Sequence, residues 1–371
     1  MDLYFFLVIL IITGVTLATN FNPVVAEAFG ASSDRLAPWN FGSSVVCLGF
    51  PTVTGVRKRL WFNLSRLYSS KITVESKIKL DPYWITGFFD GEGCITIDIQ
   101  KSKVSKTGWR VQAIFLIGLH EKDRAVLELI QSYFGGIGNI TQLGLNGVQL
   151  RVSSLKDLIK IIDHFNKYPL LTQKWADFIL WQKVIELIIN KEHLTIEGLH
   201  KIVAIKAAIN RGLSDKLKEI FPNVIPMKRP LVVDQVITDP NWVAGFISGE
   251  GCFYIGIIKS SSYKLGETPL LIFKITQHSR DEELMKSLIS YFGCGSIYKY
   301  REFIDLKVSR IKDLIDIIIP FFDKYAIKGA KAKDFTDFWK VAELMKKGDH
   351  LTEEGLNEIK RIKAGMNKGR N

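Results

Sequence analysis

The chain has 371 residues, 47% of them hydrophobic, which is enough to build the cores of two or three domains. Fifty lysines and arginines against 38 aspartates and glutamates give a net charge of +12, which favours a polyanionic partner such as nucleic acid. Ribosomal and membrane-surface proteins share this surplus, so charge alone leaves those classes open. The four cysteines form no Cys-x-x-Cys pair, which argues against a zinc site or a disulfide framework and fits a reducing compartment.

The N-terminal part of the chain differs from the rest. Residues 3–18 are apolar and uncharged but fall short of the roughly 20 residues that a membrane-spanning helix needs. A signal-like segment, a marginal membrane span and the end of a product fused upstream are all open interpretations. Residues 20–56 are rich in Gly, Ser and Pro, and residues 57–71 are basic and aromatic. We therefore expect residues 1–75 to be an extension outside the main fold.

From Asp81 onward the sequence is repeated once. DPYWITGFFDGEGCITI begins at Asp81, and DPNWVAGFISGEGCFYI begins at Asp239. The match continues through RVSSLKDL and KVSRIKDL to HLTIEGL and HLTEEGL with few insertions. Two copies indicate a duplication that predicts two similar domains related by an approximate two-fold axis, not a solenoid. We place a first domain at 76–212, a linker at 213–236 and a second domain at 237–371.

Both copies predict the same order of elements. Asp followed by Pro is typical of a helix start, and this helix ends at Gly-Glu-Gly. A strand with alternating apolar residues follows, which indicates one buried and one open face. Then come a second strand (111–119; 270–277), a helix (121–134; 281–292), two strands (137–143 and 148–153; 295–300 and 303–309) and two helices. The order αββαββα with one extra helix predicts an α+β fold with an antiparallel sheet in each domain.

Each motif helix carries two glycines four residues apart, Gly87 and Gly91 in the first copy and Gly245 and Gly249 in the second. This spacing puts both glycines on one helix face. A face without side chains lets two backbones approach closely. We therefore predict that the two motif helices, residues 82–90 and 240–248, pack against each other.

That packing would bring Glu92 and Glu250 out side by side. Two close carboxylates repel unless a cation lies between them, and their oxygen atoms suit Mg²⁺. Paired metal ions in turn suit in-line attack on a phosphodiester. A tight turn with a solvated glutamate is the alternative for a single motif, and two matched copies count against it.

The strand after each glutamate gives it a row of neighbours on one side of the sheet. An antiparallel ribbon can enter the major groove of DNA and read base edges, and basic residues of the second strand pair can add base or phosphate contacts. An ordinary solvated sheet face is the alternative. The candidate DNA-contacting residues are Cys94, Thr96, Asp98, Gln100, Arg151, Cys252, Tyr254, Gly256, Ile258 and Lys307.

WITGFFDGEG and WVAGFISGEG resemble the paired LAGLIDADG motifs of the homing endonucleases. The similarity covers residues 81–371 and extends to the FG-x-G, T-x-K and HLT-x-EGL elements. The chain is similar to the single-chain, double-motif subclass that is often encoded in fungal mitochondrial introns. This resemblance implies a mitochondrial, pseudo-symmetric monomer whose saddle-shaped sheets bind double-stranded DNA over about two helical turns and cut both strands.

The resemblance also implies the metal ligands. Glu92 and Glu250, with Gly91 and Gly249 beside them, would hold roughly two or three ions of Mg²⁺ or Mn²⁺ shared at the domain interface. Proteins of this family can also act as intron maturases. A maturase that binds host intron RNA, with or without nuclease activity, is therefore the alternative function.

Three further site residues follow from the resemblance. Lys174 in LTQKWADF matches the basic element near each metal site, and Lys331 in GAKAKDF matches it with a departure from the T-x-K pattern. Gln277 lies where the family often places a polar residue that orients the attacking water, but its repeat counterpart is Leu119. These unequal halves predict an asymmetric target and unequal cleavage of the two strands. His120 and His278, at matched positions, fit a structural role at a helix start better than a phosphate contact.

Overall fold

The computed structural model describes residues 80–233 and 235–367, which belong to one compact unit. The predicted extension at 1–75 and its apolar segment lie outside the described residues. None of the helices in the described ranges is long and apolar enough to cross a bilayer. The predicted linker contains the short helix α9 (Asp215–Ile220), and the domain boundaries remain a prediction.

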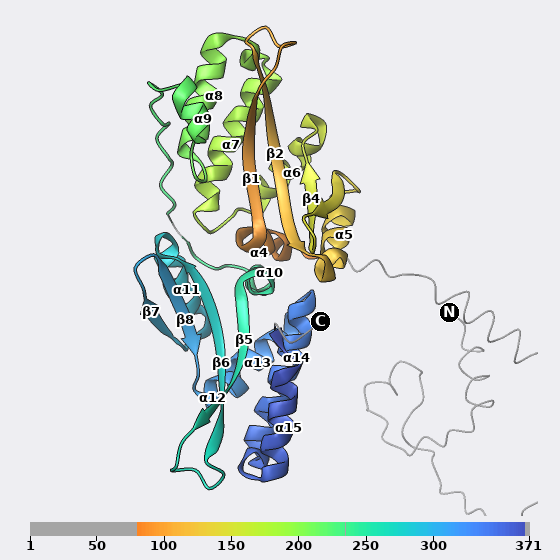
Figure 1. Cartoon of the computed structure of the whole chain (residues 1–371), viewed down its shortest axis with the longest axis vertical. Coiled ribbons are helices and arrows are strands. Elements are labelled where there is room, and N and C mark those ends of the chain that lie inside the picture. The colour runs from red at the N-terminus through yellow and green to blue at the C-terminus, as the bar shows by residue number, and fades with distance from the viewer. Residues whose placement is uncertain (1–79, 234, 368–371) are drawn as a thin grey trace, which may run out of the picture. The chain divides into compact units, whose positions relative to one another are not determined.

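The first half contains one four-stranded antiparallel sheet in the order β1-β2-β4-β3 (Figure 1). Its strands are β1 (Gly93–Lys101), β2 (Trp109–His120), β3 (Asn139–Leu143) and β4 (Gly147–Val152). Its helices are α4 (Pro82–Glu92), α5 (Arg124–Tyr133), α6 (Leu155–Lys167), α7 (Lys174–Ile189) and α8 (Ile196–Ala208), with single 3₁₀ turns η2 (Glu121–Asp123) and η3 (Glu192–Leu194).

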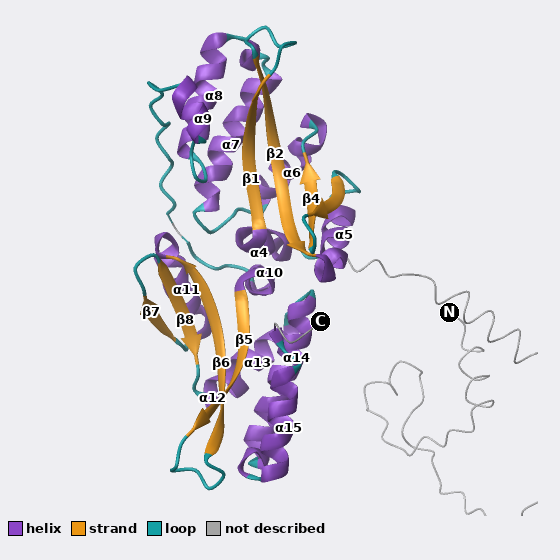
Figure 2. Cartoon of the chain, viewed as in Figure 1, coloured by secondary structure: helices purple, strands orange, loops and turns teal. Residues whose placement is uncertain are grey.

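The second half repeats this arrangement with a sheet in the order β5-β6-β8-β7 (Figure 2). Its strands are β5 (Gly251–Lys259), β6 (Glu267–His278), β7 (Ser296–Lys299) and β8 (Phe303–Val308). Its helices are α10 (Pro240–Glu250), α11 (Glu282–Phe292), α12 (Ile311–Asp313), α13 (Ile319–Lys324), α14 (Ala330–Lys347) and α15 (Glu353–Ala364), with 3₁₀ turns η4 (Ser279–Asp281) and η6 (Asp349–Leu351). The predicted α+β class with an antiparallel sheet in each half is confirmed.

The number of helices after each sheet was predicted wrongly. Three follow β4 where two were predicted, because the backbone breaks twice, at 168–173 and at 190–195. Lys191 at the second break has a positive φ of 62°, and the side chain of Thr195 then caps the next helix. In the second half the corresponding break has Gly348 at φ 83° and Thr352 as the cap.

The helix after β8 contains one local irregularity. Between the matched KDL and KY sequences the second copy has one residue more than the first. At this place α12 and α13 are joined by the π-helical segment η5 (Leu314–Ile318). A π-bulge absorbs an inserted residue without ending the helix, so the two halves keep the same packing despite the insertion.

The predicted helix starts are confirmed. The side chain of Asp81 accepts a hydrogen bond from the backbone N–H of Tyr83 at 2.8 Å, and that of Asp239 accepts one from the residue two positions on at 2.7 Å. A proline occupies the first turn of both motif helices. His120 and His278 likewise cap η2 and η4, which agrees with a structural role at a helix start.

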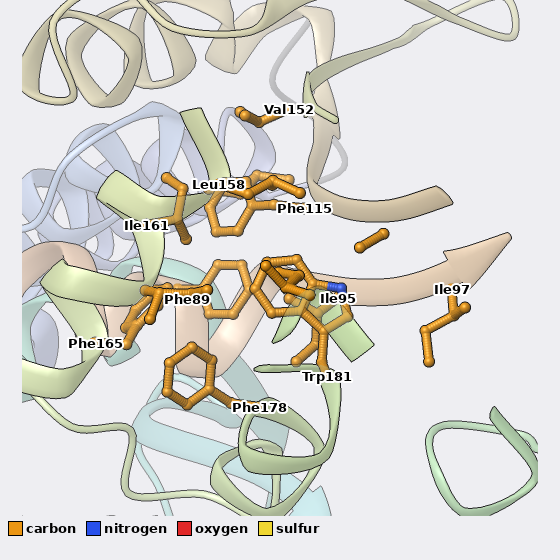
Figure 3. Close-up of a cluster of buried hydrophobic side chains, with 14 of the residues drawn as sticks. Phe89, Ile95, Ile97, Phe115, Val152, Leu158, Ile161, Phe165, Phe178 and Trp181 are labelled. Atoms are coloured by element: carbon orange, nitrogen blue, oxygen red, sulfur yellow. The ribbon is translucent and has the colours of Figure 1, made fainter. Parts of the chain in front are cut away.

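The core of each half lies between one face of its sheet and the helices. In the first half the alternation of β1 is as predicted, because Ile95, Ile97 and Ile99 are buried and the residues between them are not. Figure 3 shows this cluster, in which the rings of Phe89 and Phe115 stack with centroids 4.7 Å apart. Packing on one face leaves the other face of the sheet free to meet a ligand.

Candidate metal site and nucleic-acid interface

Helices α4 and α10 pack directly against each other where the two halves meet (Figure 1). A Cβ atom added to Gly87 would overlap the carbonyl oxygen of Trp242, and one added to Gly245 would overlap that of Trp84. The predicted contact through glycine faces is therefore confirmed. It is a backbone-to-backbone contact, which fixes the position of both helix ends closely.

The two glutamates come out at this junction as predicted. The Cγ atom of Glu250 lies 3.1 Å from the place where a Cβ of Gly91 would be, and Glu92 has the same relation to Gly249. Glu92 is exposed and Glu250 is half-buried, so a ligand can reach both. Loss of hydration beside the neighbouring protein groups raises the pKa of Glu92, and the negative charge of Glu250 raises it further. The two carboxylates thus repel each other in the absence of a cation.

Each predicted lysine lies at the C-terminal end of the motif helix in its own half. The Nζ atom of Lys174 donates hydrogen bonds to the carbonyl oxygens of Phe89, Asp90 and Gly91, at 3.1, 2.8 and 2.7 Å. Burial lowers the pKa of the Lys174 ammonium group, and the nearby carboxylates oppose that effect. The positive charge lies where the dipole of α4 is negative, which stabilises it.

Lys331 occupies the same position in the second half with fewer bonds. Its Nζ atom donates to the carbonyl oxygen of Gly249, and burial lowers its pKa as well. Glu92 and Glu250 are the two largest opposing charges at Lys331. The structure thus places two acids and two bases around one junction.

Asp90 is a site residue that the sequence reasoning missed. It is 2% exposed and accepts four hydrogen bonds, from the backbone N–H groups of Leu171 and Thr172, the Thr172 hydroxyl and the Trp242 indole. Burial raises its pKa, and these bonds oppose the shift. Because Thr172 lies two residues before Lys174, the first residue of α7, Asp90 fixes the loop that positions this lysine.

The second half has a serine at this position. Ser248 accepts one hydrogen bond from the backbone of Lys328 at 3.1 Å and donates one to Ala244 within its own helix. The indole N–H of Trp84, the repeat counterpart of Trp242, is buried and finds no hydrogen-bond partner among the described residues. The nearest sign of Asp90 in the sequence is its place inside the motif, two residues before Glu92.

Gln277 is also brought to the junction. Its side chain hydrogen-bonds to Glu250, and this bond opposes the rise in the pKa of Glu250 that burial causes. Its counterpart Leu119 has an apolar side chain, so the contact occurs in one half alone. The one-sided placement predicted for Gln277 is therefore present in the structure, while its role stays a prediction.

The predicted DNA-facing residues of β1 lie on the face opposite the core. Cys94 and Gln100 are exposed, and Thr96 and Asp98 are half-buried. Asp98 accepts a hydrogen bond from the Gln100 amide at 2.8 Å. Arg151 lies on the same sheet and bonds to the side chain of Gln112 on β2 at 3.3 Å.

The matching residues of the second sheet form a different surface. Tyr254 and Ile258 are exposed and Cys252 is half-buried. Gly256 is buried although we expected it on the open face, because the ring of Tyr254 lies within 3.1 Å of its would-be Cβ. Lys307 is held by the Tyr300 hydroxyl and by Asp305, each at 3.1 Å.

Lys206 adds a basic group to the surface of the first sheet and was not predicted. Its Nζ atom donates to the Thr96 hydroxyl at 3.3 Å from helix α8, far along the chain. Its repeat counterpart, Lys363, lines a cavity of about 760 Å³ together with Glu92 and Lys331. The last long helix of each half thus supplies a lysine, Lys206 of α8 beside the first sheet and Lys363 of α15 beside the junction.

The groups at the junction fit a hard divalent cation. The two glutamates offer oxygen atoms, and the carbonyl oxygens of Gly91 and Gly249 keep a lone pair beyond the one that the lysines occupy. Among residues 80–233 and 235–367, no group of three or more His, Cys, Asp or Glu side chains is arranged so that it could hold a metal ion by itself. Few protein ligands are typical of Mg²⁺, which completes its octahedron with water and phosphate oxygens.

Comparison with known proteins identifies the family. A family model described as LAGLIDADG endonuclease matches residues 85–185 and 243–342, one match per half. In Neurospora crassa, the protein named probable intron-encoded endonuclease 3 is 43% identical over 292 residues, covering 77% of this chain and 54% of the relative. Probable intron-encoded endonuclease 2 of the same organism is 42% identical, covering 77% of this chain and 65% of the relative. The chain thus spans between half and two thirds of these relatives.

Two solved structures cover the same region. The I-SmaMI LAGLIDADG homing endonuclease bound to cleaved DNA has a TM-score of 0.78 and 46% identity over 79% of this chain and 99% of that one. The LAGLIDADG meganuclease I-CpaMI bound to uncleaved DNA has a TM-score of 0.75 and 43% identity over 78% of this chain and 99% of that one. The resemblance that the motifs indicated is confirmed. This chain belongs to the LAGLIDADG endonuclease family.

Proposed function

We propose that the chain is a site-specific endonuclease that binds double-stranded DNA as a monomer and hydrolyses both strands with Mg²⁺. One observation carries this proposal. Two glutamates from separate halves meet at a backbone-tight junction, with a lysine beside each and an open sheet face on either side. The intact acid pair favours an enzyme over a protein that binds DNA alone.

The chemistry follows from the charges at the junction. Divalent ions held by Glu92 and Glu250 would neutralise the phosphodiester and stabilise the attacking and leaving oxygens. Lys174 and Lys331 would supply positive charge beside the same phosphates. Gln277 would orient a water molecule in the second half.

DNA as the partner has two supports. The solved I-SmaMI and I-CpaMI structures are described as bound to DNA. The net charge of +12 suits a polyanion, so binding should weaken steeply as salt rises. An in vitro splicing assay with intron RNA would test the maturase alternative, for which no observation among the described residues argues.

We also propose a mitochondrial location. A relative in Saccharomyces cerevisiae, 25% identical over 333 residues, is named an uncharacterized mitochondrial protein. A relative in Podospora anserina, 50% identical over 118 residues, is named for an ND4 intron. Imaging of a tagged chain in fungal cells checks this proposal, and exclusion of the tag from mitochondria would contradict it.

The activity is tested by incubating the protein with a library of random duplexes and Mg²⁺ and sequencing the cut ends. We expect one asymmetric sequence to be enriched, and no cleavage with EDTA. Glu92→Gln and Glu250→Gln should each slow cleavage of that target by more than about a hundredfold, because a lost metal ligand costs more than a lost supporting group.

The matched control is Glu128→Gln, an exposed glutamate of α5 in the first half, which should cleave normally. Gel-shift assays with Ca²⁺ should show that both site variants still bind the target. Full cleavage by both would rule out the glutamates as metal ligands.

A further inference from the structure

Two aspartates reach across the junction between the halves. Asp281 of the second half accepts a hydrogen bond from the backbone N–H of Gln173 at 2.8 Å, at the start of α7 in the first half. Asp123 of the first half accepts one from Ala330 at 2.6 Å, at the start of α14 in the second half. The two bonds are equivalent under the repeat, so each half supplies the N-terminal cap for one helix of the other.

The capped helices are the two that carry the lysines. Lys174 is the first residue of α7, and Lys331 is the second residue of α14. Neither helix receives a hydrogen bond from the side chain of its own N-cap residue. The first N–H groups of a helix have no partner inside it. At α7 the local Thr172 hydroxyl accepts from the N–H of Lys174 at 3.2 Å, and Asp281 of the other half accepts the N–H of Gln173 that precedes it.

The charges at the two helix starts also favour a carboxylate from the other half. A lysine in the first turn of a helix faces the positive end of the helix dipole, which is unfavourable, and a carboxylate at that end compensates. Burial raises the pKa of Asp281, and the charge of Lys174 is among the effects that oppose this rise. Asp123 opposes the burial effect that lowers the pKa of Lys331. Each aspartate is therefore electrostatically coupled to the lysine of the other half.

Both aspartates end short turns, and Asp281 is the more deeply buried of the two. Asp281 is 2% exposed, and the side chain of Gln235 also hydrogen-bonds to it. Each aspartate ends a 3₁₀ turn that directly follows a long strand of the DNA-facing sheet, β2 or β6. A histidine at the end of that strand accepts a hydrogen bond within the turn, at 3.3 Å for His120 and 3.2 Å for His278.

We propose that Asp281 and Asp123 are positioning residues that act across the interface, Asp281 through Lys174 and Asp123 through Lys331. Cleavage of each DNA strand then depends on a carboxylate from the opposite half. The strand that meets the DNA in one half is joined, through a short turn, to the lysine helix of the other. This inference rests on the proposed function, since it assigns the lysines to cleavage.

The test is strand-resolved single-turnover cleavage of the target with each strand labelled separately. Lys174→Ala and Lys331→Ala establish which strand depends on which lysine. Asp281→Ala should slow the strand of Lys174, and Asp123→Ala the strand of Lys331, each by roughly tenfold, the rate equivalent of one lost cap. Asp281→Asn and Asp123→Asn keep an oxygen that accepts the bond and should recover the rate to within about threefold.

Asp157→Ala is the matched control, because Asp157 lies in the first turn of α6, away from the junction. It should cut both strands like the natural chain. Equal slowing of both strands by each alanine variant, or no slowing at all, would overturn the inference. If the lysine variants themselves cut both strands normally, the proposed role of the lysines fails instead.

Hydrogen exchange tests the capping contact without any cleavage. It therefore separates a failure of this inference from a failure of the proposed role of the lysines. Compared with the natural chain, Asp281→Ala should speed exchange in a peptide covering 172–180. Asp123→Ala should do the same in a peptide covering 329–337. Unchanged exchange at both helix starts would overturn the capping contact itself. An effect on the variant's own half alone would show that the aspartates act locally, and this too would contradict the inference.

Discussion

The two halves share a fold but differ in how firmly they hold their lysine. In the first half Asp90 accepts four hydrogen bonds and fixes the loop before Lys174, whose Nζ atom contacts three carbonyl groups. In the second half Ser248 accepts one backbone bond, and Lys331 contacts one carbonyl. The two halves therefore share their helices, strands and apolar spacing more closely than they share the hydrogen bonds beside the site.

The difference teaches that pseudo-symmetry covers the contacts across the junction but fails at two individual polar residues. The glycines that join the halves are matched pairwise, and so are the reciprocal aspartate caps. Asp90 and Gln277 have no acidic or amide counterpart in the other half. Three predictions test where symmetry holds and where it fails, beginning with the largest effect.

Substitution of the interface glycines should destabilise the protein to a similar extent in either half. Gly87→Ala and Gly245→Ala each place a methyl group on a backbone carbonyl of the other motif helix. Because neither backbone can move without shifting the whole interface, each should lower the free energy of unfolding by at least about 4 kcal/mol. Urea denaturation followed by circular dichroism measures both.

The control is Gly118→Ala in β2, whose added Cβ would meet one flexible leucine side chain at 3.3 Å. It should change the stability by less than about 1 kcal/mol. A large difference between Gly87→Ala and Gly245→Ala would show that the interface itself is asymmetric.

A buried histidine should make the first half sensitive to acid. His164 lies among aromatic rings, with its ring nitrogens 3.1 Å from the hydroxyls of Thr86 and Tyr133, and burial lowers its pKa from 6.5 to about 4. The second half has Phe321 at this position. Between pH 6.5 and 4 the unfolded chain binds a proton that the folded chain excludes. The protein therefore keeps its full free energy of unfolding above pH 6.5 and loses part of it as the pH falls through this window.

The expected loss is up to about 3 kcal/mol in the free energy of unfolding. Denaturation at pH 7 and pH 4 measures it, and His164→Gln should flatten this part of the pH dependence. His200→Gln, at an exposed histidine, serves as the control. An unchanged slope in His164→Gln would show that the acid sensitivity has another source.

The smallest effect concerns the two indole groups at the junction. Trp242→Phe removes the bond to Asp90, whereas Trp84→Phe removes an N–H that has no partner among the described residues. The lost volume is the same, and phenylalanine keeps a ring face for Lys328, whose Nζ lies 5.8 Å from the Trp84 ring, so the difference between the two variants reports chiefly the hydrogen bond. Trp242→Phe should be the more destabilising by about 1–2 kcal/mol in urea denaturation. Equal losses would mean that the Asp90–Trp242 bond adds nothing.

Much of the frame could be predicted from the sequence because its signals are local or repeated. The helix starts at Asp81 and Asp239, the alternation after each glutamate and the glycine spacing each follow from short-range rules. The number of helices could not be predicted as well. The break at 190–195 lies in a mostly polar stretch that looks like ordinary helix surface, whereas Pro169 at the break over 168–173 is a local signal that the prediction did not use.

Site residues that belong to the family motifs could be predicted from the sequence. Residues that reach the site only through contacts between distant segments could not. Glu92 and Lys174 match family elements, so they were found. Asp123 and Asp281 occur in short turns, and nothing in their own neighbourhood shows that each caps a helix in the other half. Lys206 reaches Thr96 from more than a hundred residues away, which only the fold reveals.

The single bond between Asp90 and Trp242 has a consequence for protein engineering. A symmetric dimer built from two copies of the first half would bring an aspartate to the tryptophan on both sides of its axis. A dimer of two second halves would have serine on both sides and leave both indoles unbonded. The natural chain, with one bond of the two, therefore lies between these two dimers, and the choice of parental half would decide how strongly an artificial nuclease holds together.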